Sequence, residues 1–103
     1  MTIREVEEQL GITRANVRFY EKEGLLFPKR NPLNDYRDYS KEDVEILQKI
    51  MFLRNLGVPL EQIRLLDQGK AELSEVLLER LDALEQEREK TEESCRICRE
   101  LLE

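Results

Sequence analysis

Four glycines divide the chain into short segments, and this spacing constrains the fold more than any other feature. They stand at positions 11, 24, 57 and 69, and each follows a stretch with helical periodicity. Glycine commonly ends a helix because it adopts the left-handed backbone conformation without strain. The sequence therefore predicts a mainly α-helical fold, with short helices at about 3–10, 14–23, 41–56 and 60–68 and a long last helix from about 72 to the end of the chain.

The starts of these predicted helices carry residues that suit the first turn. Hydroxyl and carboxylate oxygens accept hydrogen bonds from the free amides of a helix start, and proline fits there because it has no amide hydrogen. Two of the patterns resemble a capping box, in which side chain and backbone bond reciprocally. The residues are Thr2 with Glu5, Thr13, Ser40 with Asp43, and Pro59.

The stretch between about 26 and 39 is predicted to be non-helical. Pro28 and Pro32 exclude a helix because proline cannot donate a backbone hydrogen bond. "NPLND" is a cluster of turn residues, and the "YRDY" that follows alternates as a strand does. Residues 25–39 are therefore expected to form a small β-hairpin, or wing.

The first two predicted helices are separated only by "GIT". A three-residue connection that contains glycine is typical of a helix–turn–helix. A plain corner between two helices of a bundle fits the same local pattern, so the spacing alone leaves both interpretations open.

The charge is distributed unevenly along the chain. Its net charge of −6 arises wholly after residue 70, because residues 71–103 hold 11 acidic and 5 basic side chains. Between Ile12 and Arg37 there are 6 basic and 3 acidic residues. The acidic total therefore does not exclude a basic, DNA-binding face in the first part of the chain.

Helix 14–23 and the wing supply candidate DNA contacts. Arg14 and Arg18 are four residues apart and share a helix face, and Asn16 can both donate to and accept from a base edge. Arg37 in the wing suits a backbone phosphate. The alternatives are that Arg14 and Arg18 are ordinary solvated arginines and that Arg37 pairs with a nearby carboxylate.

Two long stretches resemble the amino-terminal domain of MerR-family transcriptional regulators. They are "IREVEEQLGITRANVRFYEKEGLL" and "NDYRDYSKEDVEILQKIMFLRNLGVPLEQI", in family order and spacing over about residues 2–68. The resemblance implies a winged helix–turn–helix at residues 1–70, with a second wing from helices 41–56 and 60–68. It also implies an antiparallel coiled-coil dimerisation helix at 71–103. Such homodimers bind a pseudo-palindromic promoter element, and many distort its spacer so that RNA polymerase engages both promoter boxes.

Carried over by position, Arg18 and Tyr20 match recognition-helix residues that contact DNA, and Arg37 matches the phosphate-binding arginine of the wing. Phe19 stands where the family usually has tyrosine. Arg14, Ala15, Asp35, which replaces a wing glycine, and Pro59, which replaces a frequent serine, depart from the family pattern. The complete expected DNA-binding set is Arg14, Asn16, Arg18, Phe19, Tyr20, Lys22, Tyr36, Arg37, Tyr39 and Arg54.

The last helix has a heptad pattern, in which steps of four and three residues mark a coiled-coil seam with a polar middle. Because a leucine stripe of this kind is unlikely to stand alone in water, pairing with a second copy is expected. The seam, and hence the expected dimer interface, consists of Leu77, Leu81, Leu84, Arg88, Thr91, Cys95, Cys98 and Leu102.

Cys95 and Cys98 raise a second possibility, a thiol sensor of metals or oxidants. Seam packing is the favoured interpretation, since a closed zinc site needs four ligands and the chain has no histidine. No metal or other cofactor is expected. We find no catalytic motif and no signal peptide, so a non-enzymatic, cytoplasmic protein is expected.

Two other classes of function fit parts of the sequence. One is a monomeric architectural DNA-binder of the excisionase kind, and the other is a protein-interaction module that uses the acidic coil. The chain ends in "CRELLE", inside the last predicted helix. We therefore expect the sequence to be a fragment of a longer protein.

Overall fold

The computed structural model describes all 103 residues, which form two compact units, Met1–Asn55 and Leu56–Glu103. The predominance of helix and the small hairpin confirm the predicted fold class. The predicted division into residues 1–70 and 71–103 does not coincide with this boundary, and it stays a prediction.

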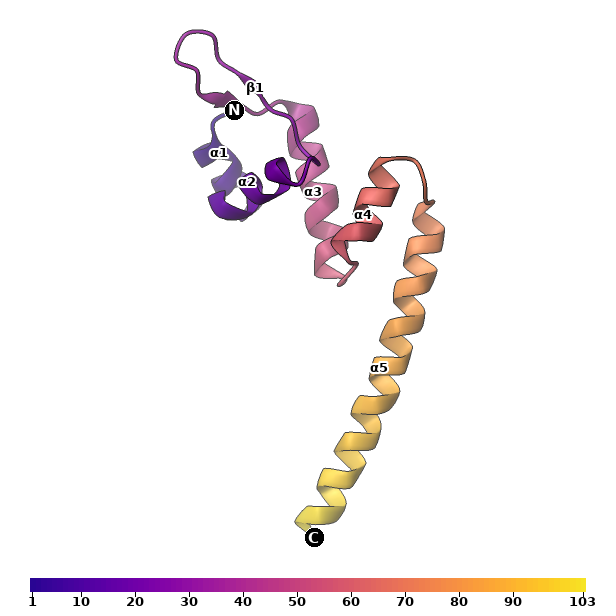
Figure 1. The fold of residues 1–103 in the computed structure, drawn as a ribbon. Coiled ribbons are helices and arrows are strands. Elements are labelled where there is room, and N and C mark those ends of the chain that lie inside the picture. The colour runs from indigo at the N-terminus through magenta and orange to yellow at the C-terminus, as the bar shows by residue number, and fades with distance from the viewer. The chain divides into compact units, whose positions relative to one another are not determined.

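The first unit contains three helices and a two-stranded hairpin (Figure 1). Helices α1 (Ile3–Leu10) and α2 (Arg14–Lys22) contact each other, as a helix–turn–helix requires. Strands β1 (Lys29–Arg30) and β2 (Arg37–Asp38) follow, and then helix α3 (Lys41–Asn55). The strands are antiparallel, with Lys29 opposite Asp38 and Arg30 opposite Arg37.

Local hydrogen bonds set the helix boundaries of this unit close to where the sequence predicts them. Thr2 and Glu5 form the capping box at the start of α1, and Gly11 ends that helix with φ 68°. The Thr13 side chain accepts from the Asn16 amide at 3.2 Å and caps α2. Ser40 and Asp43 bond reciprocally at the start of α3. The Thr13 cap fixes where α2 begins after the turn.

The core of the first unit is formed by aliphatic side chains and two tyrosines. Val17 is fully buried, and Leu25 and Leu26 just after α2 are also buried, so all three pack inward. Burying each such side chain contributes about 1.5–3 kcal/mol. The largest fully buried side chains of this unit are Val6, Val17, Leu26, Tyr39 and Leu47.

The hairpin lies within the predicted span of residues 25–39, but each of its strands is only two residues long. Its turn is held by side chains that accept backbone amides: Asn31 accepts from Leu33 at 2.9 Å and Asn34 from Tyr36 at 3.0 Å. Asp35, where the family has glycine, takes φ 61°. Because these bonds satisfy the amides within the loop, the ladder itself needs only two residues from each strand.

The second unit contains helices α4 (Leu60–Asp67) and α5 (Leu73–Leu102). Pro59 stands at the N-cap of α4 without a side-chain hydrogen bond, as the loss of the family serine implies. Val58, Ile63 and Val76 are buried. None of the helices combines the length and apolar character that a membrane span requires.

The turn before α4 is bonded to α5. Arg80 Nε donates to the Leu56 carbonyl at 2.7 Å, and Gly57 lies beside the guanidinium with φ 85°. A Cβ added at Gly57 would meet the Arg80 guanidinium carbon at 2.8 Å. Glycine suits this position because of its positive φ, and a larger residue would also displace the Arg80 guanidinium.

Candidate nucleic-acid interface

Helix α2 presents polar side chains on one side and buries the other. Arg14, Asn16 and Arg18 are exposed, whereas Val17 is fully buried. The three polar residues lie in the first half of the helix, which is the part that a helix–turn–helix presents to the major groove. Arg18 forms no ion pair within the chain, so its guanidinium is available to a ligand.

Arg14 is held by a carboxylate of α1. Its Nε and one terminal nitrogen donate to Glu7 Oε1 at 3.2 and 3.1 Å, and its backbone amide donates to Glu7 Oε2 at 3.1 Å. Glu7 therefore fixes the position of Arg14 at the start of α2. It also places negative charge beside the positive end of that helix, which is favourable.

The two aromatic residues of α2 have different environments. Phe19 is 42% exposed and Tyr20 only 7%. Their rings meet edge to face, with centroids 5.4 Å apart and an angle of 64° between the planes. Tyr20 thus packs in the core and supports Phe19.

The hairpin is joined to α2 through Glu21. Arg37 Nε lies 3.0 Å from Glu21 Oε2, and the Tyr39 hydroxyl donates to Glu21 Oε1 at 2.8 Å. Arg37 in β2 and Tyr39 just after it therefore meet the same carboxylate, whereas Tyr36 just before the strand is 73% exposed. The sequence left open that Arg37 pairs with a nearby carboxylate, and the structure shows this pair with Glu21.

Tyr39 is 1% exposed, so its side chain belongs to the core and not to the surface. Burial, and then the hydrogen bond to Glu21, raises the pKa of Tyr39. The hydroxyl therefore stays protonated and holds the Glu21 carboxylate in place. In this position Tyr39 supports Arg37 through Glu21.

A cleft of about 280 Å³ lies between the start of the chain, α2 and the wing. Four arginines line it together with three other residues, and no acidic side chain does. Clustered guanidinium groups are suited to phosphate because each offers a planar fork of donors. The lining residues are Thr2, Ile3, Arg14, Arg18, Arg30, Tyr36 and Arg37.

The cleft brings together part of the predicted set and adds to it. Arg30 and Thr2 were not predicted, because only the fold places them beside Arg18. The hairpin register offers a clue to Arg30, since it stands opposite Arg37. Lys22 and Arg54 are exposed near the ends of α2 and α3, outside the lining of the cleft.

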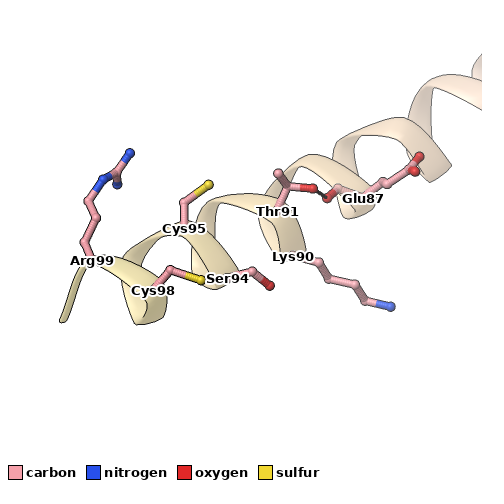
Figure 2. A pocket seen from close by; sticks show the side chains of 7 residues that line it. All are labelled: Glu87, Lys90, Thr91, Ser94, Cys95, Cys98 and Arg99. Atoms are coloured by element: carbon pink, nitrogen blue, oxygen red, sulfur yellow. Dashed lines mark hydrogen bonds between the residues drawn. The ribbon is translucent and has the colours of Figure 1, made fainter. Parts of the chain in front are cut away.

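The predicted seam of α5 is uncovered in the single chain. Leu77, Leu81 and Leu84 are 37%, 50% and 38% exposed, and both free cysteines are exposed. Figure 2 shows Thr91, Cys95 and Cys98 along the second half of the helix, among polar neighbours. No group of three or more histidine, cysteine or carboxylate side chains is arranged to hold a metal ion.

Known proteins are similar to this chain in sequence and in fold. The family model of the MerR HTH family regulatory proteins matches residues 1–70. The transcriptional regulator HmrR of Rhizobium leguminosarum bv. viciae is 33% identical over 100 residues, which cover 89% of this chain and 77% of HmrR. AdhR of Bacillus subtilis is 36% identical over 63 residues, but these are 61% of this chain and only 45% of AdhR.

Solved structures agree with these sequence comparisons. PbrR691 of Ralstonia metallidurans CH34, solved with lead(II), matches with a TM-score of 0.68 and 31% identity, over 99% of this chain and 83% of that one. HiNmlR, a MerR family regulator lacking the sensor domain and solved on promoter DNA, matches with a TM-score of 0.63 and 27% identity, over 95% and 73%. The family consists of regulatory proteins, which agrees with the expectation that this chain is not an enzyme. The chain belongs to the MerR family of helix–turn–helix regulatory proteins.

Proposed function

We propose that this chain is a sequence-specific DNA-binding transcriptional regulator that acts as a homodimer on a pseudo-palindromic promoter element. The observation that carries the proposal is the cleft in which α2 and the wing bring four arginines together. Two such surfaces in one dimer would meet two half-sites separated by a whole number of DNA turns. Distortion of the promoter spacer, with RNA polymerase as the further partner, and a cytoplasmic location belong to the same proposal.

The residues that we assign to DNA divide by position into two kinds of contact. Arg14, Asn16 and Arg18 occupy the groove-facing side of α2 and are assigned to bases, with Phe19 at their edge. Contacts to backbone phosphate are assigned to Lys22, Tyr36, Arg37 and Arg54, and we add Arg30 because it lines the cleft. Tyr20 and Tyr39 act from the core by holding Phe19 and Glu21.

The test is binding of the purified chain to its own promoter region, measured by fluorescence anisotropy over a series of salt concentrations. A scrambled duplex of the same length serves as the control. We expect tight, selective binding whose affinity falls steeply with salt, because phosphate contacts release counterions. Equal, weak binding to both duplexes by a monomer in sedimentation would favour the architectural alternative. Absence of binding at low salt would favour a protein-interaction module.

Arg18 is the sharpest single position for the test because it is exposed and unpaired on α2. Arg18→Ala is expected to weaken promoter binding by about 1–3 kcal/mol and to reduce selectivity over the scrambled duplex. Arg96→Ala is the matched control: it also removes one exposed helical arginine, but from α5, where Arg96 pairs with Glu93 and Glu100. Equal affinities for native and Arg18→Ala protein, with the fold intact, would remove Arg18 from the interface.

A further inference from the structure

Arg14, the first residue of α2, binds Glu7 of α1 through only one edge of its guanidinium. Nε and Nη2, which form this side edge, donate to Glu7 Oε1 at 3.2 and 3.1 Å. A guanidinium carries five N–H donors, one on Nε and two on each terminal nitrogen. Three donors therefore remain, and none of them bonds to another group of the chain. Two of the three, one on each terminal nitrogen, lie parallel at the end of the side chain and form a fork.

Glu7 holds this fork in one position. Its second oxygen, Oε2, accepts the Arg14 backbone amide at 3.1 Å, so one carboxylate binds both the backbone and the side chain of the same residue. The Arg14 side chain is still 51% exposed, which leaves the outer edge of the guanidinium open to a ligand. An arginine that is ordered before binding does not lose conformational entropy when the ligand arrives.

The charge of the pair disfavours phosphate as that ligand. The Glu7 carboxylate neutralises the guanidinium and would repel a second anion beside it. A neutral acceptor meets no such repulsion, and its hydrogen bonds to the fork are still charge-assisted. In helix–turn–helix proteins the first residues of the second helix lie against base edges, and Arg14 occupies this place. A base is therefore a better partner for Arg14 than the DNA backbone.

Only guanine matches a fork of two donors. In the major groove it presents two neighbouring acceptors, O6 and N7, whereas adenine sets an amino donor beside its acceptor, thymine a methyl group, and cytosine offers a donor. We infer that Arg14 reads a guanine at one fixed position of each half-site, and that Glu7 is the positioning residue behind this preference. This inference rests on the proposed function and names the base that one of its contacts recognises.

The guanine is identified by selection from a library of duplexes with a randomised central segment, using the purified chain. We expect one guanine in each half-site that is no longer selected by Arg14→Ala protein. Replacing this guanine by adenine should lower the affinity of the native protein about 5- to 150-fold, the range for a bidentate base contact. 7-Deazaguanine pairs normally but lacks the N7 acceptor. It should cost the native protein at least about fivefold in affinity and cost Arg14→Ala protein nothing.

Two effects of opposite sign separate the role of Glu7 from a purely structural one. Glu7→Ala should reduce the preference for guanine over adenine at least about fivefold. It should also raise the affinity for a scrambled duplex, because the freed guanidinium can then bind phosphate, and steepen the logarithmic salt slope by about 0.9 for each Arg14. A variant that is merely unstable would instead lose affinity for both duplexes.

Glu8→Ala is the matched control for the lost charge. Glu8 is the next residue of α1, and its carboxylate pairs with Arg4 of the same helix at 3.4 Å. This variant should keep the native preference for guanine. If Glu7→Ala impairs folding by circular dichroism, Glu7→Gln, which retains one acceptor oxygen, is used instead. It should lose part of the preference, and a preference equal to that of the native protein would show that the carboxylate is not required.

The remaining outcomes overturn the inference in distinguishable ways. If Arg14→Ala protein still selects the guanine, or if 7-deazaguanine weakens binding of both proteins equally, another residue reads that base. If Glu7→Ala keeps both the native preference and the native salt slope, Glu7 does not position Arg14. Selective binding to a sequence without the guanine overturns this inference alone, whereas selection of no sequence at all overturns the proposed function as well.

Discussion

Glu21 is the residue whose removal should most clearly disturb the proposed interface without changing any DNA contact directly. Its side chain is 11% exposed and receives both the Arg37 guanidinium and the Tyr39 hydroxyl. Glu21→Ala leaves the hydroxyl of Tyr39 buried without an acceptor, at a cost of about 1–3 kcal/mol. The lost ion pair is partly exposed to solvent and contributes up to about 1 kcal/mol more.

The expected loss of about 1–4 kcal/mol in the free energy of unfolding can be measured as a shift of the urea midpoint by circular dichroism. With a slope of about 1–3 kcal/mol per molar urea, the shift should be on the order of 1–2 M. Glu21→Gln should lose only about 1 kcal/mol, since its amide oxygen still accepts from Tyr39. Promoter binding by Glu21→Gln should also weaken, because Arg37 loses the group that orients it.

The matched control is Glu8→Ala, because Glu8 is an exposed helical glutamate whose only ion pair is with Arg4 on the same helix. A double-mutant cycle between Glu21→Ala and Tyr39→Phe isolates their hydrogen bond, and we expect a coupling of about 1–2 kcal/mol. If the free energies of unfolding of Glu21→Ala and Glu8→Ala differ by less than about 0.5 kcal/mol, the Glu21 carboxylate does not hold the wing.

Three further predictions concern stability. Asp35→Gly should stabilise the protein by up to about 1 kcal/mol in urea unfolding, because glycine adopts the φ of 61° without strain, and an unchanged or lower midpoint would contradict this. Gly57→Ala should destabilise the protein by about 1–2 kcal/mol in urea unfolding, because position 57 has a positive φ and the added Cβ displaces Arg80. In the double variant with Arg80→Ala the steric part should disappear, so strictly additive free-energy changes of the two substitutions would count against the contact. The raised pKa of Tyr39 means that the native state retains this proton while the unfolded chain loses it near pH 10, so stability should fall as pH rises above that value. Tyr39→Phe should flatten this alkaline loss in urea midpoints between about pH 8 and 11, and an unchanged slope would show that another group causes it.

The helices could be predicted from sequence because their ends are determined locally. Thr2 with Glu5 and Ser40 with Asp43 satisfy helix amides a few residues away, so the pattern and the structure coincide. The hairpin was predicted too, but not its two-residue strands. These depend on how Asn31 and Asn34 satisfy amides inside the turn, which propensity alone does not reveal.

The candidate site was only partly predictable, because its geometry depends on contacts between elements. Arg18 could be placed on α2 by helical spacing alone. The link from Glu21 to the wing joins residues 16 and 18 positions apart, and that from Glu7 to Arg14 joins two helices. Tyr39 was assigned to DNA from the family pattern, whereas burial gives it a supporting place that only the packed core reveals.

The carboxylate partners of two arginines have a consequence for how selectivity arises. Arg14 and Arg37 are each neutralised by a glutamate before any DNA arrives, so a phosphate must compete with Glu7 or Glu21 for them. Fewer counterions are then displaced than the number of arginines suggests, so the salt dependence, although steep, should be smaller than four unpaired arginines would give. A duplex whose phosphates do not meet both arginines would gain little binding free energy from replacing Glu7 and Glu21 as their partners. A duplex that presents acceptors where the Arg14 and Arg37 guanidinium groups already lie would bind both without the entropy cost of ordering these side chains.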